Sequence, residues 1–276
     1  MILGLIPFFI LYPLSNLVSF VLYRIVGYRK SVVRENLSRS FPQFDTKILR
    51  RLERLSYKNL SDVLLEGIKG FTMTRGQIRR RHFVVNPEIL DPFKAEGRTV
   101  ISLPSHYGNW EWGSLSPGLF IKDYKIVAFY KPLTNPYADR FVRKNRSRTG
   151  TMLASIYKTN ATFDSLKNER SAYIMAADQS PSNAKNVVWV NFLGIETAFL
   201  HGPEKYATKY NYPVFFVDIQ RIKRGFYRLE LSLLSDNPAE LEPGEITRRY
   251  AGKLEEAILK KPENWLWSHR RWKLSR

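Results

Sequence analysis

The amino-terminal stretch from Ile2 to Tyr23 contains no charged residue and is rich in Leu, Ile and Phe. About 20 apolar residues are enough for a helix to cross the hydrocarbon core of a bilayer. Two prolines and three polar residues interrupt or dilute the stretch: Pro7, Pro13, Ser15, Asn16 and Ser19. A helix on the membrane surface or a re-entrant hairpin therefore competes with a spanning helix.

Cationic residues follow this apolar stretch, beginning with Arg24 and continuing with Arg29 and Lys30. A secretory signal peptide would instead carry its positive charge before the apolar segment and end in small residues. By the positive-inside rule, cations after the segment keep the rest of the chain in the cytoplasm. We therefore predict a hydrophobic membrane-anchor helix within residues 1–28, and we weigh it against a buried helix of a soluble protein.

The charge and the residue composition limit the kinds of molecule that the protein can bind. The 276-residue chain has 44 Lys and Arg against 25 Asp and Glu, which gives a formal net charge of +19. With 44% hydrophobic residues it can bury a substantial core, unlike a disordered polycation. The absence of cysteine excludes disulfides, cysteine nucleophiles and thiolate metal sites. Its partners should be anionic: nucleic acid, an acidic protein or the acidic surface of a membrane.

Short apolar runs alternate with helix-like stretches along the rest of the chain. The expected strands are Thr99–Leu103, Lys125–Tyr130, Ala172–Ala176 and Val214–Ile219, with Phe226–Leu234 as an antiparallel edge strand. The expected helices lie within residues 31–74, with Asp45 as a cap, and at Pro136–Arg148, Ala161–Asn168, Ala198–Tyr210 and Gly244–Lys260. Between them, Arg75–His82 reads as a cationic turn. This alternation predicts an α/β fold with a mostly parallel sheet flanked by helices.

One histidine stands out by its position. His106 follows the expected strand Thr99–Leu103, and active residues of open α/β sheets lie just beyond the carboxyl ends of strands. Glu111 comes five residues later, so the two share a site only if His106 lies in the loop and Glu111 in the first helical turn. The carboxylate would then hold the imidazole, and His106 could act as a general base on a hydroxyl. A hydrogen-bonded structural histidine is the alternative interpretation.

Five blocks, in order, resemble the late (secondary) acyltransferases of lipid A biosynthesis, within the lysophospholipid/glycerolipid acyltransferase superfamily. The blocks are SHYGNWEW (Ser105–Trp112), YKPLTNPYADRFVRKNRSRTG (Tyr130–Gly150), AADQSP (Ala176–Pro181), VNFLGIETAF (Val190–Phe199) and PENWLWSHRRWK (Pro262–Lys273). The first is similar to the family's His-x4-Glu motif. Two positions depart from the family pattern, because Lys131 replaces a common arginine and Leu193 replaces an aromatic residue.

The resemblance implies a membrane-bound O-acyltransferase at the cytoplasmic face of the bacterial inner membrane. It would move a fatty acyl chain from an acyl thioester, usually of acyl carrier protein, to a hydroxyl of a lipid A precursor. His106 would be the general base and Glu111 would orient it, within a catalytic domain formed by residues 29–276. The family likeness implies no metal and no cofactor.

Further candidates for the site contact substrate or support the loop. Arg146, and less strongly Arg148, would bind an acceptor phosphate or an oxyanion, or would be solvated cations at a helix end. The remaining substrate-binding candidates are Asn109, Asp178 and Gln179. For Asp178 and Gln179 we favour hydrogen bonds that support the His106 loop over contact with substrate. Backbone N–H groups near Gly108–Asn109 could stabilise an oxyanion. The tryptophan cluster around His269 either packs on the sheet or binds lipid.

Three other functions compete with this interpretation. A lysophospholipid or aminolipid O-acyltransferase would use the same His106–Glu111 pair on another acceptor. A nucleic-acid-binding protein would account for the charge of +19, but the uncharged amino terminus and the lack of a recognisable binding module disfavour it. A membrane scaffold without activity is the third. We therefore expect an anionic membrane, and no nucleic acid, among the partners.

Overall fold

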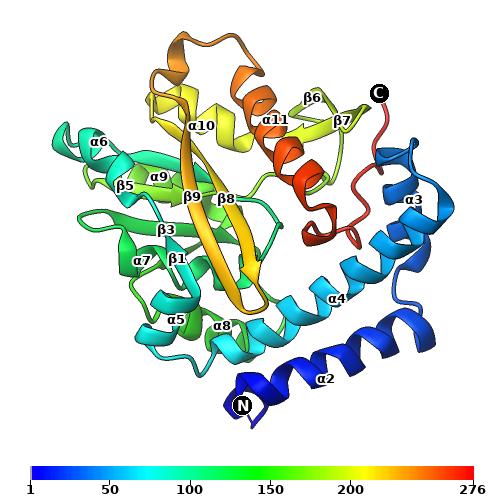
Figure 1. The fold of residues 1–276 in the computed structure, drawn as a ribbon. Coiled ribbons are helices and arrows are strands. Elements are labelled where there is room, and N and C mark those ends of the chain that lie inside the picture. Colours follow the sequence, from blue (N-terminus) through cyan, green and yellow to red (C-terminus); the bar gives the residue numbers. More distant parts are fainter. Residues whose placement is uncertain (1) are drawn as a thin grey trace.

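The structure, a computed structural model, describes residues 2–276 as an α/β fold around one seven-stranded sheet (Figure 1). The strands are β1 His82–Val84, β2 Val100–Leu103, β3 Lys125–Tyr130, β4 Met152–Ser155, β5 Ser171–Ile174, β6 Val187–Phe192, β7 Ile195–Leu200, β8 Val214–Lys223 and β9 Phe226–Ser235. The sheet order is β1-β9-β8-β2-β5-β3-β4, and β6 and β7 form a separate antiparallel hairpin. Only the β8–β9 pairing within the large sheet is antiparallel. The predicted mostly parallel α/β fold is confirmed.

Helices cover both faces of the sheet. The α-helices are α1 Ile2–Leu5, α2 Phe8–Phe20, α3 Lys30–Ser40, α4 Thr46–Gly70, α5 Arg75–Arg81, α6 Asp91–Ala95, α7 Pro117–Phe120, α8 Pro136–Ser147, α9 Thr159–Ser165, α10 Gly202–Tyr210 and α11 Glu245–Lys260. Two further helical segments are the π-helix η1 Val21–Ile25, which continues α2, and the 3₁₀-helix η3 Trp110–Ser114, which follows the His106 loop. Asp45 caps α4 as expected, because its carboxylate accepts a hydrogen bond from the backbone N–H of Ile48 at 2.7 Å.

Some element predictions were wrong in detail. Residues 198–200, expected in a helix, belong to β7, because they pair with β6 and the helix α10 begins only at Gly202. Strand β9 is antiparallel to β8 as predicted, but it is not an edge strand, since β1 pairs along its outer side. Residues Arg75–His82, expected as a turn, form α5 and the start of β1, and a capping box between Thr74 and Gln77 starts this helix.

Side chains that alternate in direction along the strands divide the core into two clusters, one on each face of the sheet. One cluster contains Ile101, Val127 and Tyr173 and packs against α9, α10 and α11. The other contains Ile126 and Ala172 and packs against α5, α6, η3 and α7. Successive side chains of β3 and β5 therefore point to opposite faces, as the pleat of a strand requires.

Helix α2 lies alongside α4, the longest helix of the fold (Figure 1). The segment Phe8–Ile25 is long and apolar enough to cross a membrane by length and composition. The division into an anchor of residues 1–28 and a catalytic domain of residues 29–276 stays a prediction.

The carboxyl-terminal segment from Pro262 onward packs against the loop that follows β2. Trp265, Trp267 and Trp272 are all buried. The backbone N–H of Leu266 donates to the carbonyl of His106 at 3.1 Å, and a β-bridge joins Tyr107 to Trp265. Of the two interpretations of the tryptophan cluster, packing is therefore the one that the structure supports.

Candidate active site

His106 lies in the loop at the carboxyl end of β2, as the sequence predicts. The next turn depends on Gly108, which has a positive φ of 64°. A Cβ atom at this position would clash with the backbone carbonyl oxygen of Ile219, so only glycine fits. The backbone N–H of Gly108 donates to the carbonyl of Asn264 at 3.0 Å, and it is therefore engaged within the fold instead of being free to bind an oxyanion.

The carboxylate bonded to the imidazole of His106 belongs to Asp178. Its Oδ1 lies 2.8 Å from Nδ1 of His106, and its Oδ2 accepts the backbone N–H of His106 at 2.9 Å. The indole N–H of Trp265 also donates to Oδ2, at 3.0 Å. Asp178 is only 2% exposed, so these donors replace the water that an ionised carboxylate loses on burial.

The charges of this pair set the protonation of the ring. Burial opposes the protonation of His106, but the charge and hydrogen bond of Asp178, with a further contribution from the charge of Glu111, raise its pKa above the ordinary value. Burial likewise opposes the ionisation of Asp178, but His106 and the donors around it hold the pKa of Asp178 below its usual range. The bonded carboxylate thus favours the tautomer with the proton on Nδ1 and leaves Nε2 as the basic nitrogen.

Glu111 corrects our prediction that its carboxylate folds back to the imidazole. It lies in η3, and its Oε2 accepts a hydrogen bond from Nη2 of Arg146 at 2.8 Å. The methylenes of Glu111 approach Gly67 of α4 so closely that a Cβ there would come within 3.2 Å of them. The packing against α4 and the guanidinium of Arg146 therefore direct this carboxylate, and Glu111 acts on His106 only through its charge.

The other predicted site residues divide into two groups. The side-chain amide of Gln179 lies 3.1 Å from Nε2 of His106, and Arg146 and Gln179 both line the cavity described below. Asn109 and Arg148 do not line it. Asn109 is fully buried and caps η3 through the N–H of Trp112, while Arg148 donates to the carbonyl of Gly70 at the end of α4. Both side chains thus satisfy buried or helix-terminal groups of the fold, and that they also bind substrate stays a prediction.

The remaining histidines have structural partners or no assigned bond. His82 is buried between Ser116 and the carbonyl of Asn109, and burial lowers its pKa to about 3. His269 accepts the backbone N–H of Ser180 through Nε2, and burial lowers its pKa to about 4. Both rings are therefore neutral near pH 7, and their pKa values shift in the opposite direction to that of His106. His201 lines the cavity at the start of α10.

A cavity of about 1440 Å³ opens beside His106. Its polar lining includes residues at the carboxyl edge of the sheet, in η3 and in α8: His106, Glu111, Lys131, Arg146 and Gln179. Much of its apolar lining comes from β3, β5, β8 and β9, on the face that α5 to α7 cover: Ile126, Ala128, Ile174, Ile219, Leu229 and Leu231. The site therefore joins a basic nitrogen and several cations to a large apolar space.

Two residues of α4 that the sequence analysis did not select also shape the site. Gly67 and Gly70 allow η3 to approach α4, since a Cβ on Gly70 would come within 3.3 Å of the indole of Trp112. Two glycines three residues apart in a predicted helix are a signal of close approach that could have identified them. The contact of Trp265 with Asp178 had no comparable signal, because the two residues are far apart in the sequence.

The whole chain was then compared with known families. Residues 1–274 match the family model described as bacterial lipid A biosynthesis acyltransferase. The chain belongs to this family. The resemblance found in the sequence is thereby confirmed for this acyltransferase over nearly its full length. A comparison with curated proteins found no match.

Proposed function

We propose that this acyltransferase moves a fatty acyl chain from acyl carrier protein to a hydroxyl of a lipid A precursor, with His106 as the general base. The observation that carries the proposal is the buried carboxylate of Asp178 on Nδ1 of His106, beside a cavity that is polar at one side and apolar along the sheet. The bonded nitrogen fixes the ring, and the opposite nitrogen is the one that accepts a proton. The amino-terminal apolar segment supports attachment to the bacterial inner membrane, and the cations that follow it support the cytoplasmic face.

The proposed reaction needs one proton carrier. Nε2 of His106 takes the proton of the acceptor hydroxyl as its oxygen attacks the thioester carbonyl carbon. The tetrahedral intermediate then collapses, the bond from carbon to sulfur breaks, and the thiolate receives the proton back from the imidazolium. The charge of Asp178 stabilises the imidazolium in between, while the ester product keeps the acyl chain.

Negative charge develops on the carbonyl oxygen, and the acceptor itself carries phosphate. Arg146 makes one hydrogen bond to Glu111 and lines the cavity, so its other N–H groups suit a phosphate or the oxyanion. Glu111 would hold the guanidinium in place and add negative potential at the imidazolium. The apolar part of the cavity, from Ile126 to Leu231 along the sheet, suits the acyl chain.

Replacing Arg146 with lysine or alanine tests its role. Alanine removes the anion contact and releases Glu111, so we expect kcat/KM to fall by about 10²-fold or more, an effect within the range of one lost oxyanion donor. Lysine keeps the charge but not the forked geometry, so it should recover only part of the loss. Steady-state rates at varied acceptor concentration measure both. Unchanged rate and apparent affinity in the folded alanine variant would contradict the role.

The purified enzyme in detergent tests the function as a whole. It is supplied with acyl carrier protein thioesters or coenzyme A thioesters, and with either a lipid A precursor or lysophosphatidate. We expect acyl transfer to the lipid A precursor from acyl carrier protein, because that acidic protein suits the exposed cations Arg140, Arg143 and Lys144 of α8. Transfer to lysophosphatidate alone would favour the lysophospholipid acyltransferase instead. Absence of transfer to either acceptor would contradict both.

A further inference from the structure

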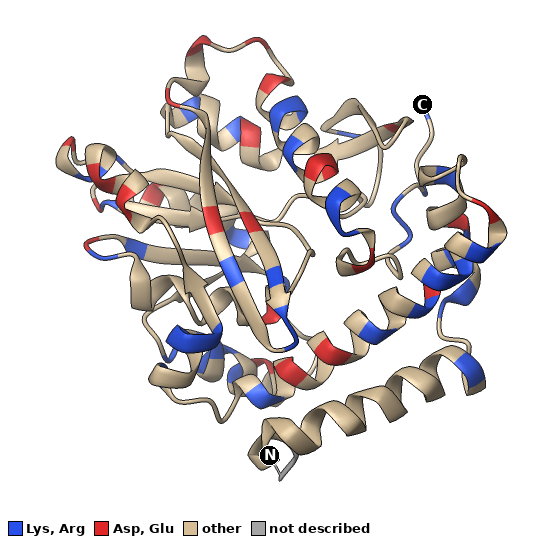
Figure 2. Cartoon of the chain, in the orientation of Figure 1, with Lys and Arg blue, Asp and Glu red and all other residues tan. Residues whose placement is uncertain are grey.

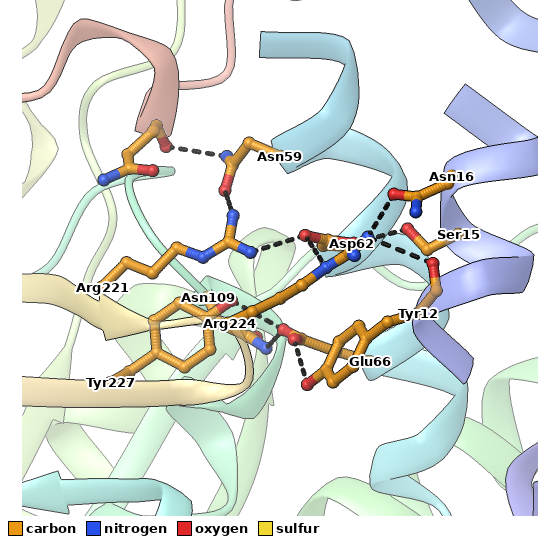
Figure 3. A network of polar contacts seen from close by, with 11 residues as sticks. Tyr12, Ser15, Asn16, Asn59, Asp62, Glu66, Asn109, Arg221, Arg224 and Tyr227 are labelled. Atoms are coloured by element: carbon orange, nitrogen blue, oxygen red, sulfur yellow. Dashed lines mark hydrogen bonds and ion pairs between the residues drawn. The ribbon is translucent and has the colours of Figure 1, made fainter. Parts of the chain in front are cut away.

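Helix α2 is apolar, but one side of it carries a polar stripe. Tyr12, Ser15 and Asn16 are spaced three and four residues apart, which places them on one face of the helix. The hydroxyl of Ser15, fully buried, donates to Oδ1 of Asp62, and the hydroxyl of Tyr12 donates to Oε1 of Glu66 at 3.1 Å. The stripe therefore faces α4 (Figure 3).

The two acidic residues that receive this stripe are buried side chains of α4. Asp62 is 1% exposed and Glu66 is fully buried, one helical turn apart on α4. Arg221 and Arg224, from β8 and the β8–β9 turn, both form ion pairs with Asp62. Figure 3 shows the guanidinium of Arg224 reaching onward to α2, where it donates to Oδ1 of Asn16 at 2.9 Å. Charged hydrogen bonds thus join α2 to the sheet through α4.

The contact continues toward the amino end of the chain. The ammonium of Lys69, near the end of α4, donates to the carbonyl of Gly4 at 2.8 Å. Asp62 lies opposite Ser15 and Lys69 opposite Gly4, so the two helices run antiparallel with their long sides together (Figure 1). Helix α2 therefore lies along the side of α4 and does not project away from the domain.

The side of α2 that faces away from α4 exposes large apolar side chains. Phe9 is 75% exposed, Leu17 58% and Phe20 56%. Ile25 and Val26 continue this apolar surface beyond the helix, at 69% and 63% exposed. Exposed apolar side chains over such an area are typical of a surface that contacts another protein or a membrane.

Cations border this apolar surface. Figure 2 shows Lys and Arg along the amino-terminal half of α4 and at the end of the α2 segment. The exposed residues there are Arg24, Lys47, Arg50, Arg51, Arg54 and Lys58. An apolar helix face bordered by cations fits the surface of an anionic bilayer, with the apolar side chains in the acyl region and the cations at the headgroups.

We propose that α2 lies parallel to the surface of an anionic phospholipid bilayer, embedded in one leaflet, and that the Asp62–Glu66 cluster holds it there instead of letting it span. A spanning α2 would take Asp62, Lys69 and Arg224 into the hydrocarbon with it, or would break every bond described above. Either event is costly, whereas the in-plane arrangement keeps these groups on the protein side. This inference rests on the membrane attachment in the proposed function and specifies its geometry.

Since the chain contains no cysteine, single cysteines can report the depth of α2. Leu5→Cys, Leu17→Cys and Val26→Cys replace exposed residues and can each carry a nitrobenzoxadiazole fluorophore. The labelled full-length variants are added to sealed vesicles of phosphatidylethanolamine and phosphatidylglycerol. Quenching by lipids with nitroxides at different depths gives the position of each label, and external dithionite shows which labels lie on the outer side. Circular dichroism confirms that each variant is folded.

We expect the three labels at similar shallow depths, with Leu5→Cys and Val26→Cys equally accessible to dithionite. A segment of 18 residues spans about 27 Å as a helix. A spanning helix would therefore place Leu17→Cys deep and protect Leu5→Cys, which would overturn the in-plane geometry while leaving membrane attachment intact. No binding to these vesicles would contradict the attachment itself. Binding at least about tenfold weaker to phosphatidylcholine vesicles would support the role of the cations.

Discussion

Replacing His106 with glutamine should lower the turnover of acyl transfer by about 10²–10⁴-fold, the range that a positioned general base contributes. Glutamine keeps a polar side chain of similar length, and its amide can still bond to Asp178, but it cannot take the proton of the acceptor hydroxyl. The loss should therefore appear in kcat, with little change in the apparent affinity for the acceptor. Initial rates with acyl carrier protein thioester and lipid A precursor measure it.

His201 offers a matched control for this experiment. It is another histidine that lines the same cavity, at the start of α10, and it has no place in the proposed proton transfer. His201→Gln should change turnover by no more than a few fold. If a folded His106→Gln enzyme turned over at a rate similar to that of His201→Gln, the general-base role of His106 would have to be abandoned.

The strand and loop that carry His106 could be predicted from the sequence, because they depend on local residue patterns. Thr99–Leu103 is β-branched and bounded by Gly97 and Pro104, which predicted a buried strand leading to His106, and β2 covers Val100–Leu103. The strands that the sequence analysis did not predict are β1, β4, β6 and β7. The β-branched run of β6 is a pattern that could have identified it. β4 and β1 are short edge strands, and β1 starts directly at the end of a cationic helix, where the charge obscured the strand.

The bonding within the site could not be predicted in the same way. The spacing of His106 and Glu111 suggested a pair, because only their separation along the chain was visible. In the fold, Asp178 comes from the loop after the neighbouring strand β5, 72 residues away in sequence, and adjacent parallel strands place their loops at one edge. Glu111 meets Arg146 for a similar reason, since α8 follows β3 and returns over the cavity.

The partners of Asn109 could not be predicted from the sequence either. Its position beside His106 suggested contact with substrate, but its side chain bonds to Glu66 at 2.7 Å and to the N–H of Trp112. A buried Asn must satisfy both ends of its amide, and here both partners lie within the fold. Because Glu66 also accepts the hydroxyl of Tyr12, Asn109 is linked through Glu66 to the amino-terminal apolar helix α2.

Asp178→Asn should reduce turnover nearly as much as the loss of His106, by about 10²-fold or more. Two N–H donors, the backbone of His106 and the indole of Trp265, bond to Oδ2 of Asp178. In the variant these donors hold the amide oxygen, so the amide NH₂ takes the place of Oδ1 and faces Nδ1 of His106. Nδ1 must then accept a hydrogen bond, which moves the ring proton to Nε2 and blocks the basic nitrogen.

The residual activity of this variant should also respond differently to pH. In the natural enzyme Asp178 raises the pKa of His106, and only the neutral ring is a base, so kcat/KM should fall as the pH drops through that raised pKa. Without the charge of Asp178 the pKa of His106 falls, and the acidic limb moves to lower pH. Glu111→Gln is the matched control, since Glu111 acts on the ring through its charge alone and should shift the limb less. An unshifted limb in a folded Asp178→Asn enzyme would show that another group titrates, and the bond between Asp178 and Nδ1 would then have no part in setting the base.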